Sequence, residues 1–463
     1  MAQLQRPRKP RPEFKSQTQE KSRSVTVKVG DPLEYRVSRL FTHLGFFVRR
    51  GRELYTVGRL DTATDLDVLA IRYSEPFHRE VQISECKGGG EGPLDRLFWL
   101  SGVKRYVGAS HATLVRRSTK WNIKDFASEL GVEVLDFPRL EELEKASGID
   151  EAVWPGASDR DYYASRQAEW TQVLSRNQAL GELYATLAGE VRFHDPFGGI
   201  NYLLYQLRSL TRDLRDERSA SESLTRFLLA ESVAQLAMFF MRVAEMTIGL
   251  SQEDRDGLIR KGLTYGHIDA GLVDRIFRNA HRITSEMVKH NTGRNIQVDQ
   301  SFFSMPEPPN VKDIQGVVRM LVTRPVVATT FGPIVDLLVQ ERFLKQRNGT
   351  DWLTKIFPYS NLRDRVSLVH DYLRVLRGID AVPEILFSSE KPRPAGTSEG
   401  QGPEVALVPA SARAPADPKD ETPKQTSAVP GGSEGADTRT KGSATLEQNN
   451  ESKGESGSAR LFE

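Results

Sequence analysis

Residues Thr64–Lys87 read TDLDVLAIRYSEPFHREVQISECK, and this stretch decides how the N-terminal part of the chain folds. It contains two apolar runs with alternating side chains, Val68–Tyr73 and Val81–Cys86, on either side of a Ser-Glu-Pro turn. Alternation with a period of two is typical of neighbouring strands that each bury one face. The stretch therefore predicts a β-hairpin.

Charged residues gather at the open end of this predicted hairpin. Asp65 and Asp67 come before the first run, and Glu85 and Lys87 close the second. Because side chains two apart on a strand share a face, about 7 Å from each other, we expect the acids and the lysine to meet at one edge of the sheet. Converging carboxylates repel each other unless a divalent cation lies between them, and such oxygen ligands suit Mg²⁺ or Mn²⁺. A lysine beside them is placed to hold a water nucleophile or a phosphoryl oxygen.

A helix is predicted just before this region. Asp31 and Pro32 form a favourable helix start, a capping acid followed by proline, and Gly45 ends the apolar pattern. Glu34 lies on the shoulder of the apolar stripe, where its carboxylate can point at the sheet edge. The alternative is a first-turn glutamate that only stabilises the helix dipole. The apolar stripe consists of Leu33, Val37, Leu40, Phe41 and Leu44.

The combination of Glu34 on a first helix, Asp67, a spacer and Glu85-Cys86-Lys87 at a strand end resembles the PD-(D/E)xK nuclease superfamily, and within it the Mrr-like restriction endonuclease branch. The resemblance covers residues 31–137, although no proline precedes Asp67. It implies a restriction-endonuclease-like αβββαβ core with a mixed central sheet. It also implies that Asp67, Glu85, Lys87 and Glu34 are catalytic, with Asp67 and Glu85 as ligands of Mg²⁺.

The pattern between residues 31 and 137 agrees with that core, because periodicity alone predicts helix, strand, strand, strand, helix, strand, helix, strand. The glycine-rich residues 88–93 lack the spacing of a phosphate-binding loop and are interpreted as a hinge. The following helix, Leu94–Tyr106, carries Arg96, Lys104 and Arg105, which either contact substrate phosphates or form a solvated basic face. In the last helix we expect Trp121, Ile123 and Phe126 to be core residues rather than base-stacking residues.

The remaining segments predict a domain organisation around this core. Residues 1–30 are expected to form a disordered basic arm, which either touches phosphates or is a solvated tail. Residues 138–158 are interpreted as a linker, and 159–390 as a separate all-α domain, because helical periodicity replaces the strand pattern there. Residues 391–463 are rich in Gly, Ser, Pro, Ala and Thr and predict a disordered tail.

The composition limits the kinds of site and the cellular location that are expected. The chain has 463 residues, a formal net charge of +2 and one cysteine, which excludes an internal disulfide and a multi-cysteine zinc site. Cys86 is expected to pack as a small apolar residue under the sheet. The apolar run Phe227–Leu250 is interrupted by charges and is interpreted as a buried helix rather than a membrane span. With no signal peptide visible, a cytoplasmic location is expected.

These observations predict a metal-dependent endonuclease that hydrolyses DNA, and the resemblance adds a role in restriction or defence against foreign DNA. The alternative is a non-cleaving nucleic-acid-binding or sensing protein that keeps the nuclease fold. DNA is the expected partner, with a second copy or a partner protein on the all-α segment. The sequence does not decide whether the substrate is DNA or RNA, which target is recognised, or whether Asp65 shares the role of Asp67.

Overall fold

The computed structural model describes residues 27–55, 62–88, 92–149, 154–155, 158–189, 195–266, 268–294, 296, 298–299, 303–345 and 349–384. All of them belong to one compact unit, Met1–Arg393. The predicted tail 391–463, residues 1–26 of the predicted arm and residues 89–91 of the predicted hinge lie outside the described residues.

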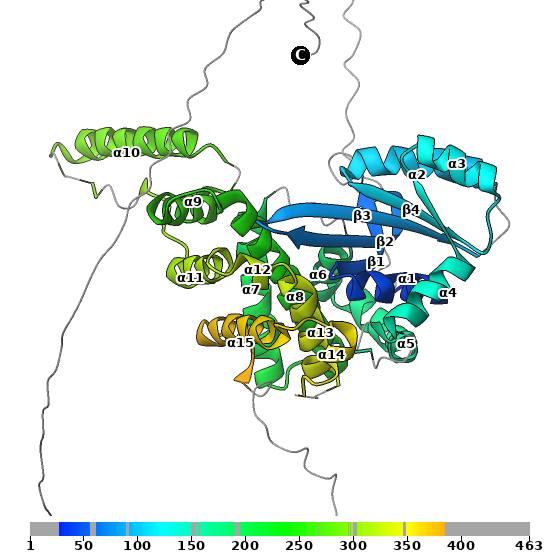
Figure 1. Cartoon of the computed structure of the whole chain (residues 1–463). Coiled ribbons are helices and arrows are strands. Elements are labelled where there is room, and N and C mark those ends of the chain that lie inside the picture. Colours follow the sequence, from blue (N-terminus) through cyan, green and yellow to red (C-terminus); the bar gives the residue numbers. More distant parts are fainter. Residues whose placement is uncertain are drawn as a thin grey trace, which may run out of the picture. The chain divides into compact units, whose positions relative to one another are not determined.

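The N-terminal part is a mixed α/β structure (Figure 1). Its strands form a single five-stranded sheet in the order β1-β2-β3-β4-β5, antiparallel from β1 to β3 and parallel from β3 to β5. The predicted hairpin is confirmed, as are the order of helices and strands and the mixed sheet. The elements are α1 (Pro32–His43), β1 (Phe47–Tyr55), β2 (Thr62–Ser74), β3 (His78–Lys87), α2 (Pro93–Val107), β4 (His111–Arg116), α3 (Trp121–Glu129) and β5 (Glu133–Asp136).

Helix α1 begins and ends where the sequence predicts. The Asp31 carboxylate accepts a hydrogen bond from the Leu33 N–H at 2.8 Å, and Pro32 occupies the first helical position. Gly45 follows the helix with φ +85°, a conformation that costs glycine little. Leu44 is the exception, because it is exposed rather than part of the buried stripe.

Helices cover both faces of the sheet: α1 packs against β1 and β2, and α2 packs against β4. The prediction that Trp121 is a core residue is wrong, since its side chain is 78% exposed at the start of α3. Ile123 and Phe126 of the same helix do pack against the core. On so short a helix, the side that the sheet covers is decided by tertiary packing.

From residue 137 onward the described chain is helical. Helix α8 (Glu222–Thr247) is long and apolar enough to cross a membrane, but its neighbours bury it, which confirms the predicted buried helix. Helices α7 and α13 pack along it. The helices are α4 (Phe137–Ser147), α5 (Arg160–Arg176), α6 (Gln178–Ala188), α7 (Pro196–Arg215), α8 (Glu222–Thr247), α9 (Gln252–Tyr265), α10 (Ala270–Thr292), α11 (Val311–Val322), α12 (Pro325–Ala328), α13 (Phe331–Leu344), α14 (Leu353–Ile356) and α15 (Leu362–Gly378).

The predicted basic arm is four residues too long. Val27 is fully buried, its N–H donates to Thr171 Oγ1 at 3.1 Å, and its carbonyl accepts from Gln167 Nε2 at 2.9 Å. Tyr35 Oη also donates to the Val29 carbonyl at 2.8 Å. The two partners on α5, 140 and 144 residues away, and the nearer partner on α1 order a segment whose own composition does not predict structure.

Candidate active site

The hairpin brings Asp67, Glu85 and Lys87 together. The β2–β3 ladder runs from Ser74 opposite His78 to Val68 opposite Ser84. Beyond that point the Cys86 N–H donates to the Asp67 carboxylate, with 2.7 Å between nitrogen and Oδ2, instead of to a backbone carbonyl. The carboxylate therefore occupies the place where the two strands separate.

The other neighbour of β2 is irregular at the same level. Arg50 pairs with Val68 and Arg52 pairs with Leu66, so Gly51 lies opposite Asp67. Gly51 has φ +58°, which a strand residue does not adopt. Regular pairing is thus interrupted on both sides of Asp67, and its side chain is fixed by Cys86 on β3.

The Lys87 ammonium lies between two carboxylates. Its Nζ is 3.0 Å from Glu85 Oε1 and 3.7 Å from Asp67 Oδ2. From α2, Arg96 adds a second cation, with its Nη1 3.5 Å from Glu85 Oε1. The Glu85 side chain is 4% exposed, that of Asp67 15% and that of Lys87 31%, so Lys87 is the most accessible of the three.

Burial sets the protonation behaviour of this group. Loss of solvation raises the pKa of Asp67, and the Cys86 N–H and Lys87 only partly offset it. Loss of solvation also raises the pKa of Glu85, and the charge of Asp67 raises it further. For Lys87, burial lowers the pKa, but the Glu85 hydrogen bond and the two carboxylates outweigh it and the net shift is upward. Lys87 therefore stays charged, whereas burial makes the charged form of both carboxylates less favourable than in water.

The basic residues of α2 separate into two groups. Arg96 reaches the site, but Lys104 does not, because its ammonium donates to the Gly131 carbonyl at 2.9 Å.

Cys86 is buried, as predicted, and burial raises the pKa of its thiol well above the ordinary value.

Glu34 lies near this group without joining it. Burial raises the pKa of Glu34 to about 7, and the charge of Asp67 contributes to the rise. The backbone of Asp31 hydrogen-bonds to the Glu34 carboxylate, which is the arrangement of a capping box. Among the described residues, no three Asp, Glu, His or Cys side chains are close enough to hold one metal ion. Glu34 is therefore not a third member of a preformed metal site with Asp67 and Glu85.

Asp65 has a different environment from Asp67. Its carboxylate is exposed and lies 3.6 Å from the Lys28 ammonium, which also approaches Glu53 at 3.3 Å. Like Asp67, it lines the cavity described next.

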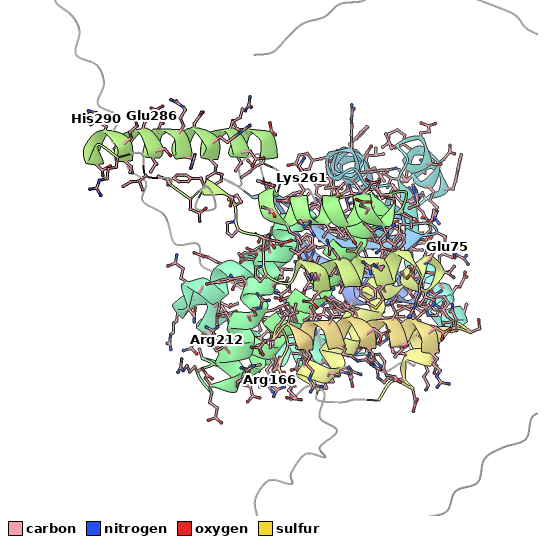
Figure 2. All side chains as sticks on the ribbon, turned by 90° about the vertical axis from the view of Figure 1, so that its left-hand side faces the viewer. Glu75, Arg166, Arg212, Lys261, Glu286 and His290 are labelled. Atoms are coloured by element: carbon pink, nitrogen blue, oxygen red, sulfur yellow. The ribbon has the colours of Figure 1, made fainter. Side chains whose placement is uncertain are left out.

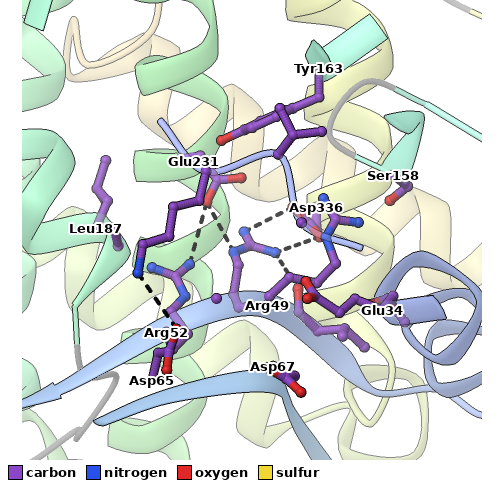
Figure 3. Close-up of a pocket in the computed structure, with 18 of the residues that line it drawn as sticks. Glu34, Arg49, Arg52, Asp65, Asp67, Ser158, Tyr163, Leu187, Glu231 and Asp336 are labelled. Atoms are coloured by element: carbon purple, nitrogen blue, oxygen red, sulfur yellow. Dashed lines mark hydrogen bonds and ion pairs between the residues drawn. The ribbon is translucent and has the colours of Figure 1, made fainter. Parts of the chain in front are cut away.

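A cavity of about 180 Å³ lies behind Asp67, between the sheet and the helices (Figure 3). Asp65 and Asp67 line it from β2, Glu34 lines it from α1, and Tyr163 and Leu187 line it from α5 and α6. Glu85 and Lys87 are not among its lining residues. Asp67 therefore lies between this cavity and Lys87, whose ammonium is 3.7 Å from its carboxylate.

A buried ion cluster, Arg49, Arg52, Glu231 and Asp336, forms one wall of the cavity (Figure 3). The Arg49 guanidinium contacts both oxygens of Asp336, at 2.8 and 3.0 Å, and its Nε lies 3.0 Å from Glu231 Oε2. Arg52 approaches the same Glu231 oxygen at 3.7 Å. Burial lowers the pKa of Arg52 to about 10, and the neighbouring charge of Arg49 adds to this.

The sequence did not predict this cluster. Arg49 and Asp336 are 287 residues apart, and no local pattern links them. On a regular strand, side chains three apart point to opposite faces. Arg49 and Arg52 nevertheless both reach Glu231, because the positive φ of Gly51 breaks the alternation between them. The one available signal was Glu231, one of the charges that interrupt the apolar run Phe227–Leu250.

Comparison of the chain with family models, with curated proteins and with solved structures gives no match. The nuclease interpretation therefore depends on the arrangement of Asp67, Glu85 and Lys87 itself.

Proposed function

We propose that the chain is a metal-dependent endonuclease that hydrolyses phosphodiester bonds in DNA. The observation that carries the proposal is the convergence of Asp67, Glu85 and Lys87 where β2 and β3 separate. A buried and a partly buried carboxylate, both with raised pKa values, form a donor set that attracts a cation. Mg²⁺ is commonly held by one or two carboxylates, with water and substrate phosphate oxygens completing its shell, so a pair is sufficient. Asp67 and Glu85 would hold the ion.

Each residue has a separate part in the proposed reaction. Asp67 is held in place by the Cys86 N–H, which fixes one ligand before any substrate arrives. A bound Mg²⁺ supplies Lewis-acid stabilisation of the charge that grows on the phosphate. With Asp67 and Glu85 holding the ion, Lys87 would direct its charge towards the phosphate or a water, and Arg96, which lies beside Glu85, would bind a neighbouring phosphate oxygen.

Three variants test the proposal on supercoiled plasmid, with Mg²⁺ and with chelator. Asp67→Asn and Glu85→Gln each remove a ligand charge and are expected to abolish cleavage and to weaken Mn²⁺ binding. Lys87→Met should leave metal binding in place and lower cleavage by about 10²–10³-fold, as for the loss of one transition-state stabiliser. Lys104→Met is the matched control, because Lys104 is on α2 but donates to Gly131. Full activity in the first three variants would exclude this site as the catalytic centre.

A second candidate is a nucleic-acid-binding or sensing protein that keeps this fold without cleaving. The observation that favours it is that Lys87 already pairs with both carboxylates. On this alternative the ion pairs are structural, so Mg²⁺ does not bind and DNA binding is independent of Asp67. Isothermal titration with Mn²⁺ separates the two, since only the nuclease requires a site that Asp67→Asn removes.

A further inference from the structure

Helix α10 carries an apolar stripe that nothing in the described chain covers. No other described helix or strand packs along it, and Figure 1 and Figure 2 both show it apart from the other helices. Its stripe consists of Leu272, Ile276, Ile283 and Met287, whose side chains are 46–59% exposed. A helix of 23 residues with four large apolar side chains in water is typical of an interaction surface.

The stripe is narrow. The next row of apolar residues, Val273 and Phe277, is half-buried. The chain beyond α10 folds back against the helix, where His281 Nε2 lies 3.0 Å from the Val298 carbonyl and the His281 ring meets Phe303 edge-on at 5.3 Å. The exposed part is therefore as wide as the seam of a coiled coil, whereas a helix that lies on a membrane presents a broad apolar face.

The spacing of the stripe is symmetric along the helix. Its members are separated by four, seven and four residues, so the pattern reads the same in either direction. A two-fold interface requires that when one residue contacts another across the axis, the reverse contact also forms. An antiparallel pair of α10 helices meets this requirement, with Leu272 against Met287 of the second copy and Ile276 against Ile283 of the second copy.

The polar residues beside the stripe fit the same pairing. Asn279 falls next to Asn279 of the second copy at the two-fold axis. Arg275 and Glu286 lie on one flank of the stripe, and in this register they are about 3 Å apart along the axis, at 1.5 Å rise per residue. Each Arg275 therefore faces Glu286 of the second copy, and the same pair forms twice. Figure 2 labels Glu286 on the exposed side of α10.

We propose that α10 is a self-association surface, on which a second copy of this chain docks its own α10 in antiparallel orientation. The proposal does not depend on the nuclease assignment. Sedimentation velocity of the full chain, at about 1–100 μM, is expected to show a reversible monomer–dimer equilibrium.

Variants of the stripe and of its flank give the decisive result. Ile276→Ser with Ile283→Ser should weaken the dimer about 100-fold, because four apolar side chains, which form two contacts, are lost per dimer. Val326→Ser, which removes another exposed apolar side chain on α12, is the matched control and should change nothing. Arg275→Glu should weaken the dimer about 5–10-fold, and adding Glu286→Arg should recover part of the loss, since Glu286 also pairs with Arg282 of its own helix at 3.0 Å. Misfolding cannot produce that recovery.

Other outcomes would overturn the proposal. A chain that stays monomeric at every concentration has no such surface. A dimer that is insensitive to the double serine variant associates elsewhere. Binding to vesicles of phosphatidylserine and phosphatidylcholine is the last measurement. If the monomer binds them and the serine variants do not, the stripe is a membrane contact instead.

Discussion

Replacing Asp336 by asparagine is expected to lower the free energy of unfolding by about 3–5 kcal/mol, the usual cost of leaving a buried charge without its partner. The substitution keeps the shape of the side chain and removes only its charge. Asp336 binds Arg49 through both carboxylate oxygens and also accepts from Gln340 Nε2 at 2.8 Å. Side-chain exposure is 7% for Arg49 and 10% for Asp336, so solvent cannot replace the lost partner.

The size of the effect follows from the charges of the cluster. In the wild-type chain, the charges of Arg49 and Arg52 balance those of Glu231 and Asp336. In the variant, two guanidinium groups share Glu231, which leaves one positive charge uncompensated in the interior. A loss of this size is a large part of a total stability of about 5–15 kcal/mol.

Urea unfolding followed by circular dichroism and by tryptophan fluorescence gives the measurement. The control is Arg215→Ala, which removes a pair at 2.6 Å to Asp380 in which both side chains are exposed, and should cost less than about 1 kcal/mol. Arg49→Met combined with Asp336→Leu should cost much less than the sum of the single substitutions, because it removes both charges. If Asp336→Asn costs no more than the exposed control, the cluster is not the buried, desolvated unit described above.

Three further results are expected. Folding raises the pKa of Glu34 from 4.5 to about 7, so between these pH values the folded chain keeps a proton that the unfolded chain has released, and stability falls as pH rises. Glu34→Gln keeps the capping box but does not titrate. From pH 5 to pH 8 its free energy of unfolding, measured by urea melts at both pH values, should rise by about 1–2 kcal/mol relative to that of wild type, after allowance for partial exposure. Gly51→Ala should lower the free energy of unfolding by about 1 kcal/mol and Gly51→Asn by less, since an added Cβ meets no atom within 4 Å and only the φ of +58° disfavours a side chain. A melting temperature of Gly51→Ala equal to that of wild type would contradict this. Mg²⁺ at millimolar concentration should raise the melting temperature of wild type by a few degrees and not that of Asp67→Asn, and an equal rise in both would place the ion elsewhere.

Local chemistry explains what the sequence predicted. The hairpin follows from alternation in Val68–Tyr73, and the start of α1 from the Asp31 cap and Pro32, because both signals act over a few residues. The convergence of Glu85 and Lys87 follows from the same period of two.

Long-range packing explains what the sequence could not predict. Val27 is ordered by Thr171, 144 residues away, and its own neighbours give no sign of it. Trp121 is exposed at the start of α3, and a helix of 9 residues has too few positions for the sequence to show which of its sides meets the sheet. The separation of residues 31–137 and 159–390 into two domains stays a prediction, and the contact between Arg49 and Asp336 joins these two segments.

That contact has a consequence for how the gene can change. The guanidinium groups come from β1, and the carboxylates come from α8 and α13. A recombination event that exchanged only the sheet, or only the helices, would leave charges without counterparts in a region closed to solvent. Substitutions of exposed residues outside the cluster are expected to lower the free energy of unfolding by less. The two segments are therefore expected to be inherited as one piece, and a chimaera made at residues 138–158 should fold only if it carries both sides of the cluster.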